Sequence, residues 1–482
     1  MSDATPLVAE LTPAPDPVAA CTRCADLPFL VFLDSATDPT HLGRYSFLAA
    51  DPATAVRSKG QLTQQLVADR WIRVGGDPLE QVRALLAPHA TPPAAGLPPF
   101  QGGAAGYVGY DWGSTLERLP RPRFDDLAIP DVLLGLYDWV VAWDRANGRA
   151  WIVSTGLPET GAARARRAAD RLALVRQRLA GVAPAARHAP HAPPHARPGA
   201  APSYPVPGLP GVRSNFTRSG YTDAVARVID YVYAGDIFQA NLSQRLEAPL
   251  VGTPFELYRR LRQRNPAPFA AFLDFGDVVL ASSSPERFLR VDAGRQVEAR
   301  PVKGTRPRGT GPEHDAALAL ALAESDKDRA ENVMIVDLLR NDLSRVCRPA
   351  TVRVPELFTL EHYATVHHLV STVVGELAPE HDAGDLVRAA FPGGSVTGAP
   401  KVRAMQIIAE LEPTQRAAYC GAIGYWSVTG ALDTSIVIRT YLALGSDVYF
   451  QVGGGIVADS DPEQEYRETL DKAGGLVAAL TP

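Results

Sequence analysis

The residues best suited to chemistry lie in the second half of the chain, beginning with an acidic side chain on the apolar face of an expected helix. A serine followed by two aspartates predicts that this helix spans 325–343. Its apolar stripe runs through Met334, Ile335 and Leu338, and Glu331 extends the stripe at helical spacing. Burying a carboxylate unpaired is costly, so Glu331 needs a cation or a hydrogen-bond donor. A glutamate that reaches solvent or pairs with an arginine fits the same pattern.

More carboxylates lie on the last expected helix, which begins at Asp461 with proline at its first position. Glu465, Glu468 and Lys472 follow at i, i+3 and i+7 on one face, a row typical of a solvated salt-bridge surface. Here the row follows the glycine-rich stretch 451–457, which permits close approach of a ligand to the backbone. Carboxylates from two helices and a ligand carboxylate would suit Mg²⁺, which keeps several waters.

A glycine-rich loop over 391–405 leads into another expected helix. Ser395 and Thr397 supply hydroxyl groups, and Lys401 and Arg403 supply positive charge near the free N–H groups of the helix start. This combination favours an anion. The spacing is not that of a Walker A loop, and such a segment alone is more often an ordinary loop-to-helix junction than a site.

A basic segment over 300–308 follows the short motif at 284–287. Glu286 and Lys303 would make an acid and an amine nucleophile if they faced one cavity. The three arginines of the basic segment would give a net-acidic protein the local positive charge needed to hold a dianion. The alternative is a basic turn on the surface.

Composition excludes several classes of function. The 482 residues carry a formal net charge of −5, which gives no general footprint for nucleic acid or an anionic membrane surface. No apolar run approaches the roughly 20 residues of a membrane-spanning helix, and the N-terminus lacks a secretory pattern. Beyond a lone C-x-x-C at Cys21 and Cys24, the four cysteines show no disulfide or zinc spacing. We therefore expect a cytoplasmic protein with reduced thiols.

An Ala/Pro/His-rich segment over 181–207 cannot bury a core and is expected to be a linker. It separates an N-terminal part, 1–180, from a larger part, 212–482, that holds all the motifs above. In the larger part, apolar residues at helical spacing predict a helix over 221–234. The N-terminal part mixes β-rich stretches with a helix expected over 160–179.

Together these motifs resemble the catalytic domain of chorismate-utilising enzymes, a family that includes anthranilate synthase component I, aminodeoxychorismate synthase component I, and isochorismate and salicylate synthases. The resemblance covers the larger part almost from end to end and the N-terminal part more weakly. It implies an α+β fold, with large antiparallel β-sheets packed face to face and helices outside. The matching segments are SPERF, RPVKGTRPRG, ENVMIVDLLRNDLSRV, VHHLVSTVVG, FPGGSVTGAPKVRAMQII, GAIGYW, IVIRT and QVGGGIVADSDPEQEYRETLDKA.

The resemblance also implies roles for individual residues. Glu331 and Glu468, with Glu465 nearby, correspond to the ligands of Mg²⁺. Glu286 corresponds to a general acid, and His368 would lie near the C4 hydroxyl group that leaves chorismate. Arginine, lysine and glycine backbone positions would hold carboxylates, and other positions would complete the pocket. The substrate-binding residues implied in this way are Gln239, Gly304, Thr305, Ser395, Tyr425, Arg439, Gly453, Gly455 and Lys472.

Two positions favour amination of chorismate at C4 over the other reactions of the family. Gln239, in a strand expected over 237–245, occupies the place of a water-activating lysine in isochorismate and salicylate synthases. Lys303 occupies a place where anthranilate synthases typically have alanine and aminodeoxychorismate synthases typically have lysine. The implied mechanism is attack of Lys303 on C2, with Glu286 assisting loss of the C4 hydroxyl group. Ammonia then adds at C4 and releases the lysine, and the enolpyruvyl group stays intact.

The resemblance implies a partner and leaves an alternative activity. No G-x-C-x-G nucleophile segment of a glutamine amidotransferase occurs, so ammonia is expected from a separate amidotransferase subunit or from solution. Anthranilate synthase component I is the main alternative, because it shares the fold and the metal residues. Isochorismate synthase is disfavoured by Gln239, and a non-catalytic tryptophan-binding subunit by the competent residue at every matched catalytic position.

The segments that form the tryptophan pocket of anthranilate synthases differ here. The pattern L-L-E-S is replaced by Phe32–Ser35, with Asp34 for glutamate, and N-P-S-P-Y-M by Asn265–Ala270, with Ala270 for methionine. These differences argue against inhibition by tryptophan, while a cavity at this place is compatible with them.

Overall fold

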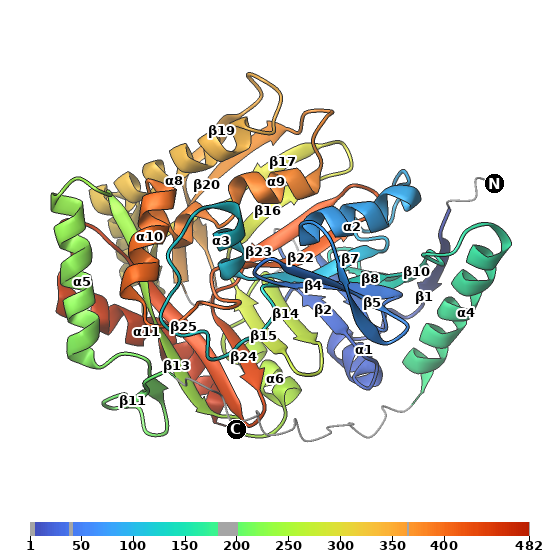
Figure 1. The fold of residues 1–482 in the computed structure, drawn as a ribbon, viewed down its shortest axis with the longest axis horizontal. Coiled ribbons are helices and arrows are strands. Elements are labelled where there is room, and N and C mark those ends of the chain that lie inside the picture. The colour runs from blue at the N-terminus through green and yellow to red at the C-terminus, as the bar shows by residue number, and fades with distance from the viewer. Residues whose placement is uncertain (1–4, 38–41, 182–200, 364–365, 482) are drawn as a thin grey trace.

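Two large β-sheets form the framework of the protein, seen in a computed structural model that describes residues 5–37, 42–181, 201–363 and 366–481 (Figure 1). Neighbouring strands in the first sheet run antiparallel. In spatial order this sheet consists of β1 (Leu7–Leu11), β10 (Arg149–Ser154), β9 (Trp139–Asp144), β3 (Tyr45–Ala49), β2 (Leu30–Asp34), β14 (Phe269–Asp274), β15 (Val279–Ser284), β24 (Thr440–Leu444), β25 (Asp447–Ile456), β13 (Gln239–Pro249), β12 (Arg213–Ser214) and β11 (Tyr204–Pro205), with β21 (Gly398–Ala399) also paired to β13.

The second sheet is antiparallel as well. Its strands, in spatial order, are β18 (Val302–Pro307), β20 (Val366–Glu376), β17 (Gln296–Ala299), β16 (Arg287–Val291), β23 (Leu432–Ile436), β22 (Ala422–Ser427), β7 (Gly103–Val108), β8 (Val132–Tyr137), β4 (Thr54–Lys59), β5 (Leu62–Val67) and β6 (Arg70–Val74), with β19 (Arg353–His362) also paired to β20.

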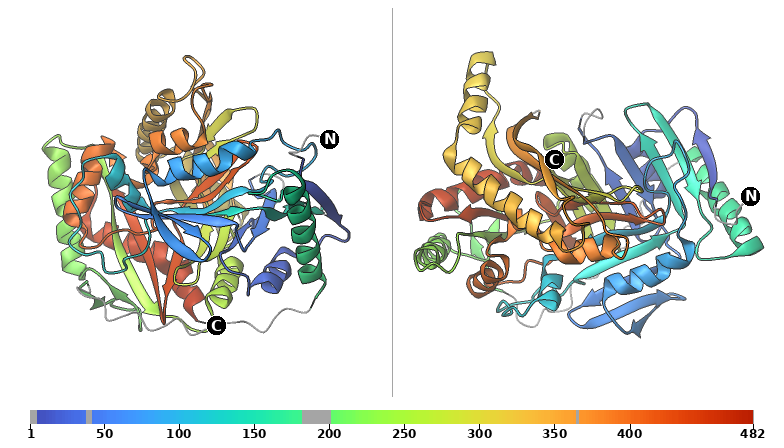
Figure 2. Two further views of the ribbon diagram at one scale, coloured as in Figure 1. Left: turned by 45° about the vertical axis from the view of Figure 1, so that its right-hand side comes forward. Right: turned by 90° about the horizontal axis from the view of Figure 1, so that it is seen from above.

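Helices cover the outer faces of the sheets. Helices α5 and α11 contact each other, α10 packs on β13, and α8 packs on β18 and β20, whereas α4 lies at the opposite end beside β1 and β10 (Figures 1 and 2). The helices are α1 (Pro17–Cys24), α2 (Pro78–Leu86), α3 (Gly113–Leu116), α4 (Gly161–Ala180), α5 (Arg218–Tyr233), α6 (Pro254–Arg264), α7 (Pro312–Ala323), α8 (Asp326–Ser344), α9 (Ala383–Ala390), α10 (Lys401–Leu411) and α11 (Pro462–Leu480), with short 3₁₀ helices η1 (Ala87–His89), η2 (Tyr110–Trp112) and η3 (Gly394–Val396).

The alternation of side chains along each strand explains why the two sheets pack face to face. Every residue of β9 is buried, and successive side chains point to opposite faces of the sheet. Trp139, Val141 and Trp143 enter a core shared with α1 and α4, whereas Val140 and Ala142 enter the core between the sheets. The α+β fold with face-to-face antiparallel sheets and outer helices, expected from the family resemblance, is confirmed.

Both parts of the sequence contribute strands to both sheets. In the first sheet β2 pairs with β14, so that Phe32 lies opposite Phe272. In the second sheet β7 pairs with β22, which places Ala105 opposite Tyr425. Most of the segment expected to be a linker, residues 182–200, lies outside the described residues.

The helices that carry the candidate site begin where the capping patterns indicate. Ser325 is the N-cap of α8, and its hydroxyl group accepts a hydrogen bond from the Asp328 backbone N–H. Asp461 caps α11 in the same way, with proline at the first helical position. Among the described residues, no helix is long and apolar enough to cross a membrane.

A buried ion pair ties the glycine-rich loop to β13. Glu412 and Arg416 are each 3% exposed, and two oxygen–nitrogen contacts of 2.7 and 2.9 Å join them. Glu412 also accepts hydrogen bonds from the backbone N–H and the hydroxyl group of Ser243, both at 2.8 Å. The Arg416 guanidinium donates to the carbonyl groups of Asn241 and Val396. Both charges are therefore fully hydrogen-bonded inside the protein, as their burial requires.

Removing one partner of this pair should destabilise the protein strongly. We expect Arg416→Met to lower the free energy of unfolding by about 3 kcal/mol or more, because Glu412 is left buried without a cation. Urea denaturation measures this. Arg348→Met is the control, because its partner Glu376 and Arg348 itself are half-exposed, and the loss should stay below about 1 kcal/mol. Equal losses in the two variants would contradict the role given to the buried pair.

Candidate active site

Lys303 lies at the centre of the candidate site. It projects from β18, and its Nζ atom is 3.8 Å from Oε2 of Glu331 on α8. The two side chains are only 12% and 16% exposed. The glutamate that the helical pattern predicts on an apolar face therefore lies inside the protein, with a lysine as its cation.

Glu286 is a second carboxyl group beside Lys303, in the turn between β15 and β16. It is 5% exposed, and it accepts hydrogen bonds from the Ser395 hydroxyl group and the Val302 backbone. Burial raises the pKa of Glu286 to about 7, although Ser395, Lys303 and Val302 oppose the shift. Near neutral pH this carboxyl group is protonated in a large fraction of molecules, so it has a proton to give to a leaving group.

Gln239 reaches the same place from the start of β13. Its side chain is 1% exposed, and within the part of the chain that the structure describes its Oε1 atom has no hydrogen-bond partner. It lies over the backbone of Gly455 on β25, where an added Cβ atom would be 2.1 Å from Gln239 Nε2 and 3.5 Å from Lys303 Nζ. Only glycine at this position allows the amide and the lysine to approach each other over the strand.

His368 on β20 lies opposite Thr305 on β18, two residues from Lys303. Its Nδ1 atom is 2.9 Å from the Thr305 hydroxyl oxygen, and the backbone of Gly304 also forms a hydrogen bond with the ring. Burial, together with the charge of Arg439, lowers the pKa of His368 to about 4. His368 is therefore a neutral imidazole at physiological pH.

Helix α11 brings its acidic and basic residues to the glycine-rich strand β25. Lys472 Nζ is 2.6 Å from Glu468 Oε1 and 2.9 Å from the Gly453 carbonyl oxygen. An added Cβ atom at Gly454 would lie 2.9 Å from Glu465 Oε2 and 3.6 Å from Glu468 Oε1. Both carboxylates thus lie over the strand, and glycine leaves room for them.

The three carboxylates matched to metal ligands each have a protein partner. Glu331 faces Lys303 and Glu468 faces Lys472, while Glu465 accepts a hydrogen bond of 2.6 Å from Ser460. Across residues 5–37, 42–181, 201–363 and 366–481, no three acidic, histidine or cysteine side chains are grouped as metal ligands. The donor set nevertheless fits Mg²⁺, because this ion binds through one or two carboxylates and takes its remaining ligands from water and substrate.

The environments of the α11 carboxylates differ. Burial raises the pKa of Glu465, although the Ser460 hydroxyl group opposes the shift. Burial also acts on Glu468, but the charge and hydrogen bond of Lys472 outweigh it and lower the pKa of Glu468. Glu468 is therefore an anion at neutral pH and lies beside the charges of Lys327 and Lys303.

Arg439 joins this cluster, and Tyr425 does not. The Arg439 side chain donates to the Lys472 carbonyl oxygen and lowers the pKa of His368 by its charge. Tyr425 points from β22 into the core between the sheets, where its ring stacks on Phe100 at 4.7 Å. Tyr419 is the tyrosine that interacts electrostatically with Arg439. Both tyrosines belong to the same short segment, and the pattern of residues there does not reveal which one faces the site.

Tyr425 lines a separate cavity of about 360 Å³. The two segments that differ from the tryptophan-pocket pattern meet in the wall of this cavity, through Asp34 and Ser35 on one side and Phe269 and Ala270 on the other. The two departures from the tryptophan-pocket pattern, Asp34 and Ala270, therefore both lie in the wall of this cavity.

Lys401 and Arg403, expected to favour an anion at the start of α10, have carboxylate partners instead. Lys401 Nζ is 2.6 Å from Asp342 Oδ2 and also donates to the Ala390 carbonyl group. Arg403 pairs with Asp236 at 3.2 Å. Their charges are neutralised within the fold, so of the glycine-rich loop it is Ser395 that contacts the cluster.

Three further residues reach the cluster without a signal in the sequence. Lys327, in the first turn of α8, acts on Glu465 and Glu468 by its charge. Glu361 and Tyr363, at the end of β19, lie beside His368. Glu361 and Tyr363 have no motif of their own, because their importance comes from strands that pair across long stretches of sequence.

Comparison with known proteins agrees with this geometry. A family model described as chorismate binding enzyme matches residues 31–478. Aminodeoxychorismate synthase component 1 of Salmonella typhimurium is 42% identical over 456 residues, covering 94% of this chain and 93% of that protein. Anthranilate synthase component 1 of Thermus thermophilus is 40% identical over 483 residues, covering 96% and 95%.

A solved structure has the same fold along most of its length. Anthranilate synthase component I from Streptococcus pneumoniae superposes with a TM-score of 0.75 at 31% sequence identity, covering 90% of this chain and 92% of that one. The family match spans both parts of the sequence and includes every residue of the Lys303 cluster. The chain therefore belongs to the family of chorismate-binding enzymes.

Proposed function

We propose that this chain is the chorismate-aminating component of an aminodeoxychorismate synthase, which places ammonia at C4 and keeps the enolpyruvyl group. Lys303 is the observation that carries the proposal. Relatives of both kinds, aminodeoxychorismate and anthranilate synthases, have similar identities of 42% and 40%. The distinction therefore rests on a buried primary amine between Glu331 and Glu286, where it can act as a nucleophile.

In the proposed reaction the Nζ atom of Lys303 attacks C2 of chorismate. The C1–C2 double bond moves to C1–C6, the C5–C6 double bond moves to C4–C5, and the C4–oxygen bond breaks as Glu286 gives its proton to the departing hydroxyl group, which leaves as water. Ammonia then attacks C4, both double bonds return to their original positions, the bond from C2 to Lys303 breaks, and the new ammonium group at C4 returns a proton to Glu286. Glu286 suits this role because its raised pKa keeps a proton available near neutral pH.

The nucleophile in this proposal is ammonia, and Gln239 supports the choice. Its Oε1 atom, which has no hydrogen-bond partner among the described residues, is an acceptor for an N–H donor beside Lys303. An amide cannot remove a proton from water as an amine base can. Ammonia would come from a separate glutamine amidotransferase subunit. A cytoplasmic location belongs to the same proposal and is supported by four free, buried cysteines.

We include Mg²⁺ in the proposal, held by Glu331 and Glu468 with Glu465 behind them. When bound, the ion would neutralise the ring carboxylate of chorismate. Lys472 and Arg439 would add positive charge at the same end of the substrate, and Lys472 already holds Glu468 in place. The exposed half of the Glu468 side chain leaves its carboxylate accessible to a ligand.

Product analysis tests the role of Lys303. With chorismate, Mg²⁺ and an ammonium salt, we expect mass spectrometry to find a product that retains the enolpyruvyl group and that an added lyase converts to 4-aminobenzoate. Lys303→Ala and the charge-preserving Lys303→Arg should both lower its formation by about 100-fold or more, because neither can form the bond to C2. Anthranilate and pyruvate from the unaltered protein, or C4 amination at an unchanged rate in both variants, would contradict the proposal.

The raised pKa of Glu286 predicts an alkaline loss of activity. A general acid must be protonated, so kcat/KM for chorismate should be highest below the pKa of about 7 and fall about tenfold per pH unit above it. The concentration of free ammonia is held constant across the series, since ammonium itself titrates. Glu286→Gln should be slow and should lack this alkaline limb. If the alkaline fall of kcat/KM persists unchanged in Glu286→Gln, this fall belongs to the titration of another group.

Glu468 should govern the response to magnesium. We expect Glu468→Gln to raise the Mg²⁺ concentration for half-maximal activity by about tenfold or more, and to weaken Mg²⁺ binding in titration calorimetry. Glu463→Gln is the matched control, because Glu463 lies on the same helix and pairs with Arg218 and Arg467. An equal change in both variants, or none in Glu468→Gln, would count against the proposed ligand.

A further inference from the structure

A row of three side chains crosses the sheet at His368. Strand β20 lies between β18 and β19 here, with Thr305 opposite His368 on one side and Glu361 opposite it on the other. Residues directly opposite each other in antiparallel strands point to the same face, with Cβ atoms about 5 Å apart. The imidazole is therefore flanked by a hydroxyl group and a carboxylate on the same face of the sheet.

Glu361 is a partly buried carboxylate with two hydrogen-bond partners. Its side chain is 13% exposed, and Oε1 accepts a hydrogen bond from the guanidinium of Arg300. Its Oε2 atom accepts a hydrogen bond of 2.7 Å from the hydroxyl group of Tyr363. These two donors hold the carboxylate group in one orientation, with its charge close to the sheet.

Tyr363 connects this carboxylate to the imidazole. The Tyr363 and His368 ring centroids are 5.3 Å apart, with an interplanar angle of 66°. An edge-to-face contact of this kind restricts rotation of the imidazole ring. On the other side the Thr305 hydroxyl group meets Nδ1. His368 is thus held by contacts on both sides.

We propose that Glu361, through Tyr363 and with Arg300 behind it, is a positioning residue that fixes the orientation and the proton arrangement of the His368 imidazole in the reaction proposed above. A carboxylate beside an imidazole stabilises one arrangement of its ring protons. In keeping with this, the charge of Glu361 favours the protonated form of His368 and acts against burial and Arg439. His368 is then held ready for the C4 hydroxyl group.

A purely structural ion pair between Arg300 and Glu361 is the competing explanation, and the chain supplies a control for it. Arg300 also contacts Glu356, whose Oε2 atom lies 3.3 Å from Nη1. Glu356 lies opposite Thr372 on β20, and it contacts Arg300 and accepts a hydrogen bond from Thr372. Glu356→Gln therefore removes a carboxylate charge from Arg300 and leaves the link through Tyr363 to His368 intact.

The first measurement is the NMR signal of the His368 ring in the free protein. The protein is labelled with ¹³Cε1-histidine, and His368→Gln identifies the signal among 10 histidines. We expect Glu361→Gln and Tyr363→Phe to shift this signal, because each alters the group that orients the ring, and Glu356→Gln to leave it in place. Tyr363→Phe keeps the aromatic ring and leaves the carboxylate paired with Arg300, so it also serves if Glu361→Gln fails to fold.

The second measurement separates positioning from binding. With chorismate consumption as the readout, kcat of Glu361→Gln should fall about tenfold while KM for chorismate changes less than about twofold. An unmoved His368 signal in Glu361→Gln and Tyr363→Phe, or an equal movement in Glu356→Gln, would overturn the proposal. The NMR measurement needs no substrate, so its result stands whichever product is found, whereas anthranilate as the product would overturn the proposed function alone.

Discussion

The candidate site depends on one buried ion pair, between Glu412 and Arg416. A single guanidinium donates to carbonyl groups of β13 and of the glycine-rich loop, which are separated by more than a hundred residues. Ser395 lies in that loop and contacts Glu286, while Gln239 begins the strand. The pair thus sets the distance between the two segments that close the site around Lys303. Its burial makes it rigid, because neither charge has water to replace its partner.

Around this anchor, burial and local cations give similar carboxyl groups different tasks. Glu286 is enclosed and its pKa is raised to about 7, so it can hold a proton. Glu468 lies against Lys472, which lowers its pKa and keeps it anionic. The two groups therefore separate proton transfer from cation binding within one site. Lys303 is close enough to interact electrostatically with both Glu286 and Glu468.

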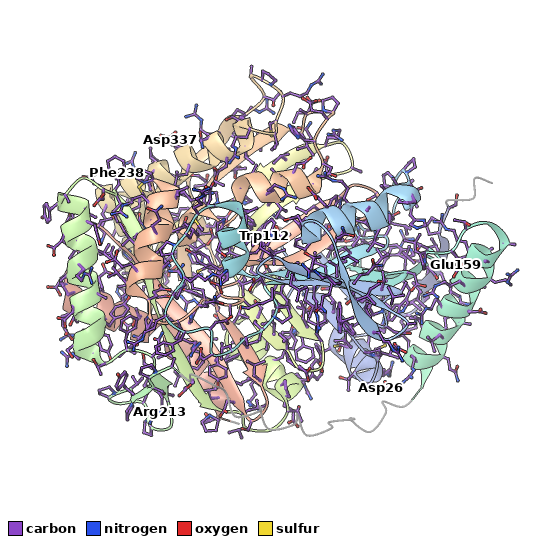
Figure 3. All side chains as sticks on the ribbon, in the orientation of Figure 1. Asp26, Trp112, Glu159, Arg213, Phe238 and Asp337 are labelled. Atoms are coloured by element: carbon purple, nitrogen blue, oxygen red, sulfur yellow. The ribbon has the colours of Figure 1, made fainter. Side chains whose placement is uncertain are left out.

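The N-terminal part of the sequence is needed for this arrangement even though none of its described residues belongs to the cluster. Its strands complete both sheets, and the core between the sheets takes side chains from both parts. Trp112, labelled near the middle of Figure 3, is fully buried against Phe391 at the start of the glycine-rich loop. Arg300 contacts both regions of the molecule: it lines the separate cavity, and it also holds Glu361 next to His368.

Much of the structure was determined by patterns within the sequence. Capping residues and apolar spacing placed the helices that begin at Asp326 and Pro462. The position of Glu331 on an apolar stripe favoured a buried carboxylate with a cation or donor, with a solvent-reaching or arginine-paired glutamate as the alternative, and the structure supplies Lys303. These inferences succeed because helix periodicity and the cost of burying charge act over a few neighbouring residues.

Tertiary structure decided which residues meet across long stretches of chain. The separation of Tyr425 from the site, the pairing of Lys401 with Asp342, and the approach of Glu361 to His368 all follow from sheet pairing and packing. The resemblance to a known family placed most of the cluster, but not these three features. Strand alternation gives two equivalent faces, and a charged residue has many possible partners. Only the completed fold selects the face and the partner, because burial of each side chain depends on strands distant in sequence.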